Sequence, residues 1–225
     1  MTSKPTRILG VIHHPQTLPQ LFAFFQKEIT QGRLKPGTRV GIELAEKEFE
    51  QIMKGKVPAA KALNTEHGKL EFGIHPTIAS YWHQLAVELK QGGIEIVPIL
   101  PKNIFERESQ FLKARIKKAK SREDVEQTVF GERELFSVGT QEKAMIERIP
   151  KLNLDYAVIG ENHAPEVVKA LTAKGHSVTN PFQQKYPRAY ARQESHKIRN
   201  QKLENARQWY KERKKYKKSK TIIKR

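Results

Sequence analysis

Short apolar runs alternate with segments of helical spacing along most of the chain, and this alternation restricts its fold more than any other feature. The apolar runs that indicate buried strands are 7–13, 39–44, 94–100, 154–159 and 176–179. The segments that indicate helices are 18–29, 45–54, 76–91, 103–120, 141–149 and 165–174, and Ser121-x-x-Asp124 is a capping-box variant that can start another. Strands that alternate with helices form mostly parallel sheets with helices on both faces. We therefore expect an α/β domain in residues 1–182.

Composition limits the kinds of site that this fold can carry. The chain has 225 residues and no cysteine, so disulfides and thiolate metal sites are excluded, and any metal must use nitrogen and oxygen ligands. The longest uninterrupted apolar run is 21–25, far shorter than the about 20 residues of a membrane-spanning helix. No signal-like hydrophobic stretch follows the N-terminus. These features predict a cytoplasmic protein with no membrane span.

The net charge of +18 is concentrated in two segments. Residues 183–225 hold 16 Lys and Arg against three Glu, for +13, and residues 102–122 hold eight against two, for +6. The rest of the chain is therefore close to neutral, and basicity placed so locally is typical of contact with nucleic acid or another polyanion. In 102–122, Lys113, Lys117 and Lys120 share one helical face, which is also typical of an ordinary amphipathic surface helix. We expect 183–225 to form a basic, helical C-terminal extension.

Aromatic residues are interleaved with the cations of this extension. Four of the six tyrosines lie in it together with Trp209. Aromatic faces can stack on unpaired bases while Lys and Arg neutralise phosphates, so the extension predicts binding of RNA or single-stranded nucleic acid, with ribosomal RNA among the candidates. The predicted contact residues are Arg188, Arg192, Lys197, Arg199, Arg207, Trp209, Tyr210, Arg213, Lys214 and Lys215. In the alternative interpretation, Ile198, Leu203 and Trp209 pack on the domain while the charges face water.

Polar residues follow the expected strands where parallel strands end together. His13 and His14 end the first strand, Glu43 ends the second, and Glu161-Asn-His163 follows the fourth. Ligands of open parallel sheets bind beyond the carboxyl ends of the strands, because side chains from several strands converge there. Two imidazoles and one carboxylate are a donor set for a catalytic divalent metal that keeps an open position for water.

The same residues have a simpler interpretation. A polar residue at the end of a buried strand often satisfies loop backbone groups or caps the next helix, so 162–165 could be only a helix entry. His75 and His83 are more typical of capping, packed or solvated residues than of ligands. The chain has neither a Gly-rich phosphate loop nor a Ser nucleophile elbow. The pattern by itself leaves a metal site and a purely structural role open.

The sequence resembles the TraB/Tiki superfamily at these positions. Two Gly-x-x-His motifs, at 10–13 and 160–163, stand on the first strand and the last strong strand, and Glu43 follows the second in Val-Gly-Ile-Glu-Leu. The stretch 157–178 is similar to the superfamily's closing strand-helix-strand unit, and the likeness covers residues 7–180. The superfamily includes the Tiki metal-dependent proteases, and erythromycin-esterase-like and ChaN-like proteins are wider relatives.

The resemblance implies a divalent metal, Mn, Co or Zn, held by His13, Glu43 and His163, with hydrolysis of a peptide or ester by an activated water. His14 and Glu161 are candidates for supporting these ligands, because a ligating imidazole usually donates its other N–H to a carboxylate or carbonyl. At 100–102 and 141–145 the chain departs from the superfamily's acidic and Arg-containing segments. We therefore expect an RNA-binding protein on a TraB/Tiki-like core that has lost catalysis, or alternatively a metal-dependent peptidase or esterase.

Overall fold

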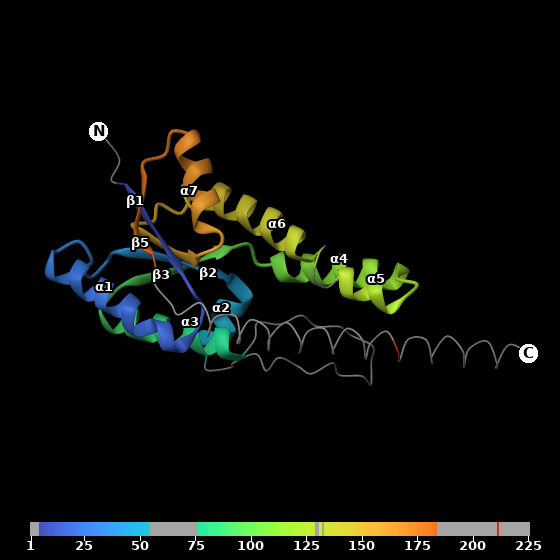
Figure 1. Cartoon of the computed structure of the whole chain (residues 1–225). Coiled ribbons are helices and arrows are strands. Elements are labelled where there is room, and N and C mark those ends of the chain that lie inside the picture. Colours follow the sequence, from blue (N-terminus) through green and yellow to red (C-terminus); the bar gives the residue numbers. More distant parts are fainter. Residues whose placement is uncertain (1–4, 55–75, 129–130, 132, 184–210, 212–225) are drawn as a thin grey trace, which may run out of the picture. The chain divides into compact units, whose positions relative to one another are not determined.

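A computed structural model describes residues 5–54, 76–128, 131, 133–183 and 211, and its strands and helices alternate along the chain (Figure 1). The strands are β1 (Thr6–Val11), β2 (Arg39–Ala45), β3 (Glu95–Leu100), β4 (Tyr156–Gly160) and β5 (Val178–Gln183). The helices are η1 (Pro15–Thr17, 3-10), α1 (Leu18–Thr30), α2 (Glu46–Met53), α3 (Pro76–Gln91), α4 (Ile104–Lys118), α5 (Arg122–Gln127), α6 (Arg133–Arg148) and α7 (Ala164–Ala173). Within the described segments, no helix has the length and apolar character needed to cross a membrane.

The chain divides into two compact units. The described residues of the first unit are 5–54, 76–104 and 138–183, and they contain the whole sheet. The described residues of the second unit are 105–128, 131, 133–137 and 211, which lie mainly in α4, α5 and the start of α6. The sequence predicts residues 1–182 as one domain, but the described residues between 105 and 137 belong to the second unit.

The sheet has five strands in the order β3-β2-β4-β1-β5, and every pairing is parallel. The α/β prediction is confirmed. Val11 at the end of β1 is opposite Gly160 at the end of β4, so their carboxyl ends meet at one edge. The strands β2, β4 and β1 are neighbours at the centre, and the residues that follow them are therefore brought together.

Apolar side chains on alternate strand positions build the core, because successive side chains of a strand point to opposite faces. One face carries Leu9, Ile42 and Val158 among others, and these pack in one cluster with buried residues of α1 and α3. The other face is closely approached by α7: a Cβ added to Gly10 would lie 3.1 Å from the Cβ of Ala164. Figure 1 shows α1 and α3 on one side of the sheet and α7 on the other.

Both edge strands contain a proline. Pro98 lies in β3 opposite Ile42 of β2, and Pro181 lies in β5. Proline has no backbone N–H and is therefore tolerated in a sheet mainly on edge strands. The sequence predicts a last strand that ends at Thr179, but β5 continues through Pro181 to Gln183.

A buried carboxylate ties α1 to the amino ends of two central strands. The side chain of Glu28 is 3% exposed. It accepts hydrogen bonds from the Tyr156 hydroxyl (2.7 Å) and from the Arg33 guanidinium (2.6 and 2.9 Å), and it pairs with Arg7. Burial alone raises the pKa of Glu28, but the hydrogen bonds from Arg33 and Tyr156 and the positive charges outweigh it, so the net shift is downward.

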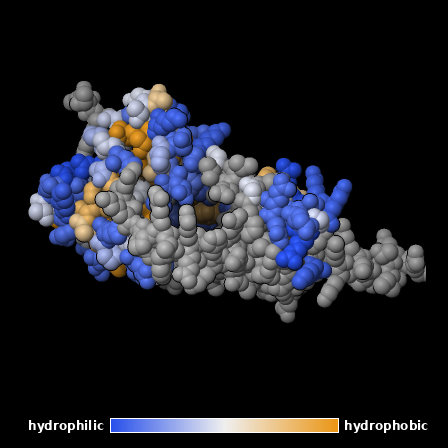
Figure 2. Space-filling view, in the orientation of Figure 1, coloured by the Kyte–Doolittle hydropathy of each residue, from blue (hydrophilic) through white to orange (hydrophobic). Residues whose placement is uncertain are grey.

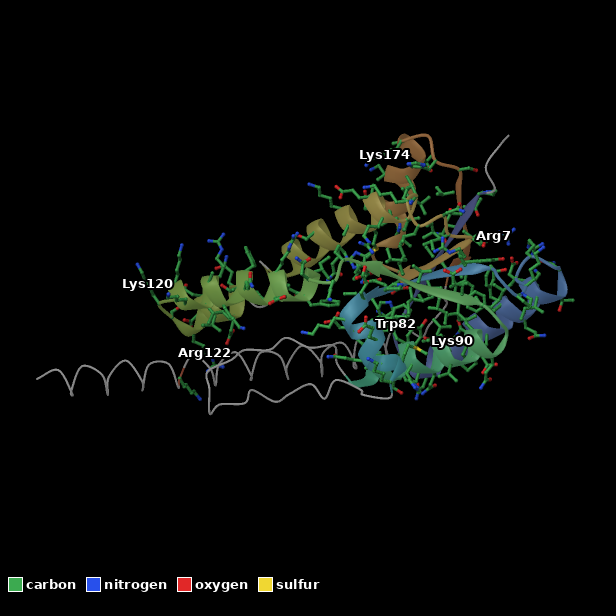
Figure 3. The ribbon with its side chains drawn as sticks, turned by 180° about the vertical axis from the view of Figure 1, so that it is seen from behind. Arg7, Trp82, Lys90, Lys120, Arg122 and Lys174 are labelled. Atoms are coloured by element: carbon green, nitrogen blue, oxygen red, sulfur yellow. The ribbon has the colours of Figure 1, made fainter. Side chains whose placement is uncertain are left out.

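The second unit shows the predicted capping box. Ser121 Oγ accepts a hydrogen bond from the Asp124 N–H at 3.1 Å, and the Asp124 carboxylate accepts one from the Ser121 N–H at 3.1 Å. The visible atoms of α4 and α5 are mostly hydrophilic (Figure 2), and Figure 3 labels Lys120 and Arg122 on either side of the cap. The exposed cations of this stretch are Arg107, Arg115, Lys117, Lys118, Lys120 and Arg122.

Candidate active site

The side chains of His13, Glu43 and His163 lie together at the carboxyl edge of the sheet. Glu43 is near the end of β2, His13 follows β1, and His163 precedes α7. Glu43 Oε2 is 3.8 Å from His13 Nε2, and Glu43 Oε1 is 3.7 Å from His163 Nε2. The three residues come from three neighbouring strand ends, as the sequence predicts. One carboxylate therefore stands between two imidazoles.

Gly160 allows these side chains to approach the backbone. Its N–H donates a hydrogen bond to Oε2 of Glu43. A Cβ at this position would lie 3.3 Å from Glu43 Oε2 and 3.4 Å from ring carbons of both His13 and His163. Such distances are closer than most carbon contacts, so a larger residue would push the cluster apart. The glycine of the second Gly-x-x-His motif thus has a packing reason to be there.

Aromatic rings of α3 enclose His13. The ring centroid of His13 is 4.7 Å from that of Trp82, labelled in Figure 3, and 5.7 Å from that of Tyr81. His13 Nε2 is buried and has no hydrogen-bond partner among the described residues. Burial lowers the pKa of His13; the charge of Glu43 raises it and His163 lowers it further, with a net downward shift. The neutral form of the imidazole, which is the form that can bind an ion, is therefore favoured.

A second carboxylate contacts His163 from α6. Oε1 of Glu142 lies 3.1 Å from His163 Nδ1, within hydrogen-bond distance. Sequence reasoning did not single out Glu142. Its neighbours Gln141 and Met145 are buried, so helical periodicity could have indicated that one face of this part of α6 is buried. No sequence signal connects Glu142 with His163, because the contact depends on how α6 packs.

The residues predicted to support the ligands occupy other positions. His14 caps η1, where its Nδ1 accepts a hydrogen bond from the Gln16 N–H at 3.3 Å. The side chain of Glu161 is exposed, and the carboxylate that contacts His163 is Glu142 instead. His75 and the predicted nucleic-acid-binding residues at 188–215 lie outside the described residues.

The donor atoms of the site are of the kinds that bind a divalent metal, but their distances are not those of a bound ion. Within the described part of the chain, no group of three or more His, Asp or Glu side chains could hold a metal ion as placed. Two ligands of a tetrahedral ion are separated by about 3.4 Å, whereas the two N···O separations here are 3.7 and 3.8 Å. The nitrogen and oxygen donors suit Mn, Co or Zn, and His13 Nε2 lacks a partner. As placed, the donors are therefore slightly farther apart than the ligands of a tetrahedral ion.

No protein-family model, curated protein or solved structure matches this chain. A fold class shared by many unrelated functions does not assign an activity, so the function has to be inferred from the chemistry of the site.

Proposed function

We propose that His13, Glu43 and His163 form the active site of a metal-dependent hydrolase that acts on a peptide or an ester. The observation that supports this most directly is the partnerless Nε2 of His13 beside the Glu43 carboxylate. A buried polar atom without a hydrogen bond destabilises a protein by about 1–3 kcal/mol. Such atoms are retained where an ion, a water or a substrate completes their bonding.

The chain's own residues would prepare this site in distinct ways. His13, Glu43 and His163 would hold the ion, which when bound acts as a Lewis acid and lowers the pKa of a bound water. The Gly160 N–H fixes one oxygen of Glu43, which limits the rotation of the carboxylate. Trp82 excludes water from one side of His13 and thereby strengthens the electrostatic interactions of the site.

The same geometry supports the proposed relationship to the TraB/Tiki superfamily. Both Gly-x-x-His motifs lie at the ends of adjacent strands, β1 and β4, and Glu43 comes from β2 on the other side of β4. We regard the hydrolase as the primary proposal because His13, Glu43 and His163 all belong to the described residues.

Metal analysis and hydrolysis assays test the proposal on the full chain. The purified protein, loaded with Mn²⁺, Co²⁺ or Zn²⁺, should bind metal and hydrolyse members of a panel of fluorogenic peptides and nitrophenyl esters. Both properties should be lost in the His13→Ala, His163→Ala double variant. His176→Ala is the matched control, since His176 is exposed in the turn after α7. Metal content and hydrolysis that survive in the double variant would contradict the proposal.

A second function is supported by the charge of residues 183–225, which carry +13 of the +18 total. We propose that this extension binds RNA or single-stranded nucleic acid through phosphate neutralisation and base stacking. Such binding is compatible with a hydrolase core or with one that has lost catalysis, because it uses different residues.

A further inference from the structure

We propose that Glu142 is a positioning residue that holds His163 in the tautomer with its proton on Nδ1. The Glu142 and His163 side chains are 14% and 13% exposed, and their Oε1 and Nδ1 atoms are 3.1 Å apart. An ionised carboxylate can only accept hydrogen bonds. The ring nitrogen that faces it must therefore be the donor.

This hydrogen bond determines what the other ring nitrogen can do. A neutral imidazole carries one proton, so a proton on Nδ1 leaves Nε2 with a free lone pair. That Nε2 points to Glu43 Oε1 across 3.7 Å, which is too long for a direct hydrogen bond. Two acceptors then face each other, and a cation or a water donor between them would satisfy both. This step rests on the proposed function, because it prepares Nε2 to bind an ion or a water.

Packing of α6 explains why Glu142 can do this reliably. Gln141 and Met145 in α6 and Ile149 just after the helix are buried, so packing holds the part of the backbone that carries Glu142. In free neutral histidine the proton resides mainly on Nε2, which would block that nitrogen as a ligand. Glu142 thus shifts the imidazole away from its intrinsic preference, as carboxylates behind metal-binding histidines do in general.

Nitrogen NMR of the histidine side chains tests this inference without any metal or substrate. The full chain is labelled with ¹⁵N-histidine, His163 is assigned by its loss in His163→Asn, and long-range ¹H–¹⁵N spectra are recorded at pH 8. We expect a protonated Nδ1 and an unprotonated Nε2 in the wild type. Glu142→Ala should shift the proton towards Nε2, whereas Glu142→Gln retains an acceptor oxygen and should keep the wild-type tautomer. Glu161→Ala is the matched control and should leave the spectrum unchanged.

Co²⁺ binding by the same variants is measured in a separate experiment. Loss of the carboxylate in Glu142→Ala should weaken Co²⁺ binding about 10- to 100-fold, with partial rescue in Glu142→Gln. A wild-type His163 whose neutral ring carries its proton on Nε2 overturns the inference. An unchanged tautomer in Glu142→Ala also overturns it. If the tautomer responds but no metal binds to any variant, the metal-dependent hydrolase fails while the positioning role of Glu142 stands.

Discussion

The backbone N–H of Gly160 donates a hydrogen bond to Oε2 of Glu43, so the end of β4 holds the carboxylate that ends β2. This contact joins a motif glycine to a site residue 117 positions away in the chain. A larger side chain at position 160 would therefore displace the side chains of the site.

Replacing Gly160 by Ala should therefore disturb the site more than the fold. The added Cβ would lie 3.3 Å from Glu43 Oε2 and 3.4 Å from ring atoms of His13 and His163. Overpacking of this kind destabilises proteins by about 1–3 kcal/mol. We expect the free energy of Co²⁺ binding to weaken by at least the same amount. Gly139→Ala is the control, because nothing lies within 4 Å of its Cβ position. Equal Co²⁺ affinity in the two variants, measured by titration calorimetry, would show that the cluster tolerates displacement.

Removal of the Glu28 carboxylate should strongly destabilise the first unit. Glu28→Ala leaves Arg7, Arg33 and the Tyr156 hydroxyl without their common partner, and breaking a buried pair of this kind costs about 3 kcal/mol. Urea denaturation measures the change. Glu95→Ala is the comparison: Glu95 pairs with Arg39 at 3.0 Å but is 54% exposed, so its loss should cost below about 1 kcal/mol. Similar losses in both variants would indicate that burial does not strengthen the Glu28 network.

The same network predicts how stability depends on pH. The folded state lowers the pKa of Glu28 below its ordinary value of 4.5, so below that value the unfolded chain binds a proton more readily than the folded one. The contribution of Glu28 is therefore fully present above about pH 4.5 and is lost as the pH falls through the lower pKa of the folded state. Denaturation of wild type and Glu28→Gln between pH 3 and 6 should show a steeper acid loss in the wild type. Parallel curves would argue against the shift.

Deletion of residues 184–225 should abolish most RNA binding and leave the sheet intact. The deletion begins after Gln183 because β5 ends there, and it removes +13 of the +18 charge. Each phosphate contact contributes about −0.7 to the log–log salt slope for single strands, so the full chain should show steep salt dependence in fluorescence anisotropy with oligonucleotides. Unchanged affinity in the truncated chain would exclude the extension as the binding segment. Circular dichroism checks that the truncated chain folds.

Stacking can be separated from charge within the extension. Replacing Trp209 and Tyr210 by Ala should weaken single-strand binding, because base stacking contributes about 1–3 kcal/mol per base, while the salt slope stays the same. Arg213→Gln with Lys214→Gln is the complementary variant and should reduce the slope. If the aromatic variant changes the slope instead, the rings act by placing the cations rather than by stacking.

Much of the fold could be predicted because apolar periodicity depends on local residues. The strand at 39–44 and the helix at 76–91 were expected within one residue of β2 and α3. The start of α6 at Arg133 was missed, since Gly139 lies inside the helix and does not interrupt it. Proline and glycine mark boundaries only on average, and tertiary packing decides each case.

The candidate site also contains residues that could be predicted from the sequence and one that could not. His13, Glu43 and His163 could be expected at one place because parallel strands end at the same edge of a sheet. Glu142 could not, because α6 reaches the site through packing that leaves no trace in the spacing of the sequence. Residues on strand ends are thus predictable from topology, whereas a supporting residue on a helix such as α6 depends on tertiary packing.

The prolines of the two edge strands also determine how this sheet can meet another chain. An exposed edge strand can recruit a foreign strand, which leads to domain swapping or to fibrous aggregates. Pro98 in β3 and Pro181 in β5 each lack a backbone N–H, so each edge strand has one donor fewer than a strand without proline. Proline in both outermost strands is therefore expected to weaken the pairing of a foreign strand with this sheet.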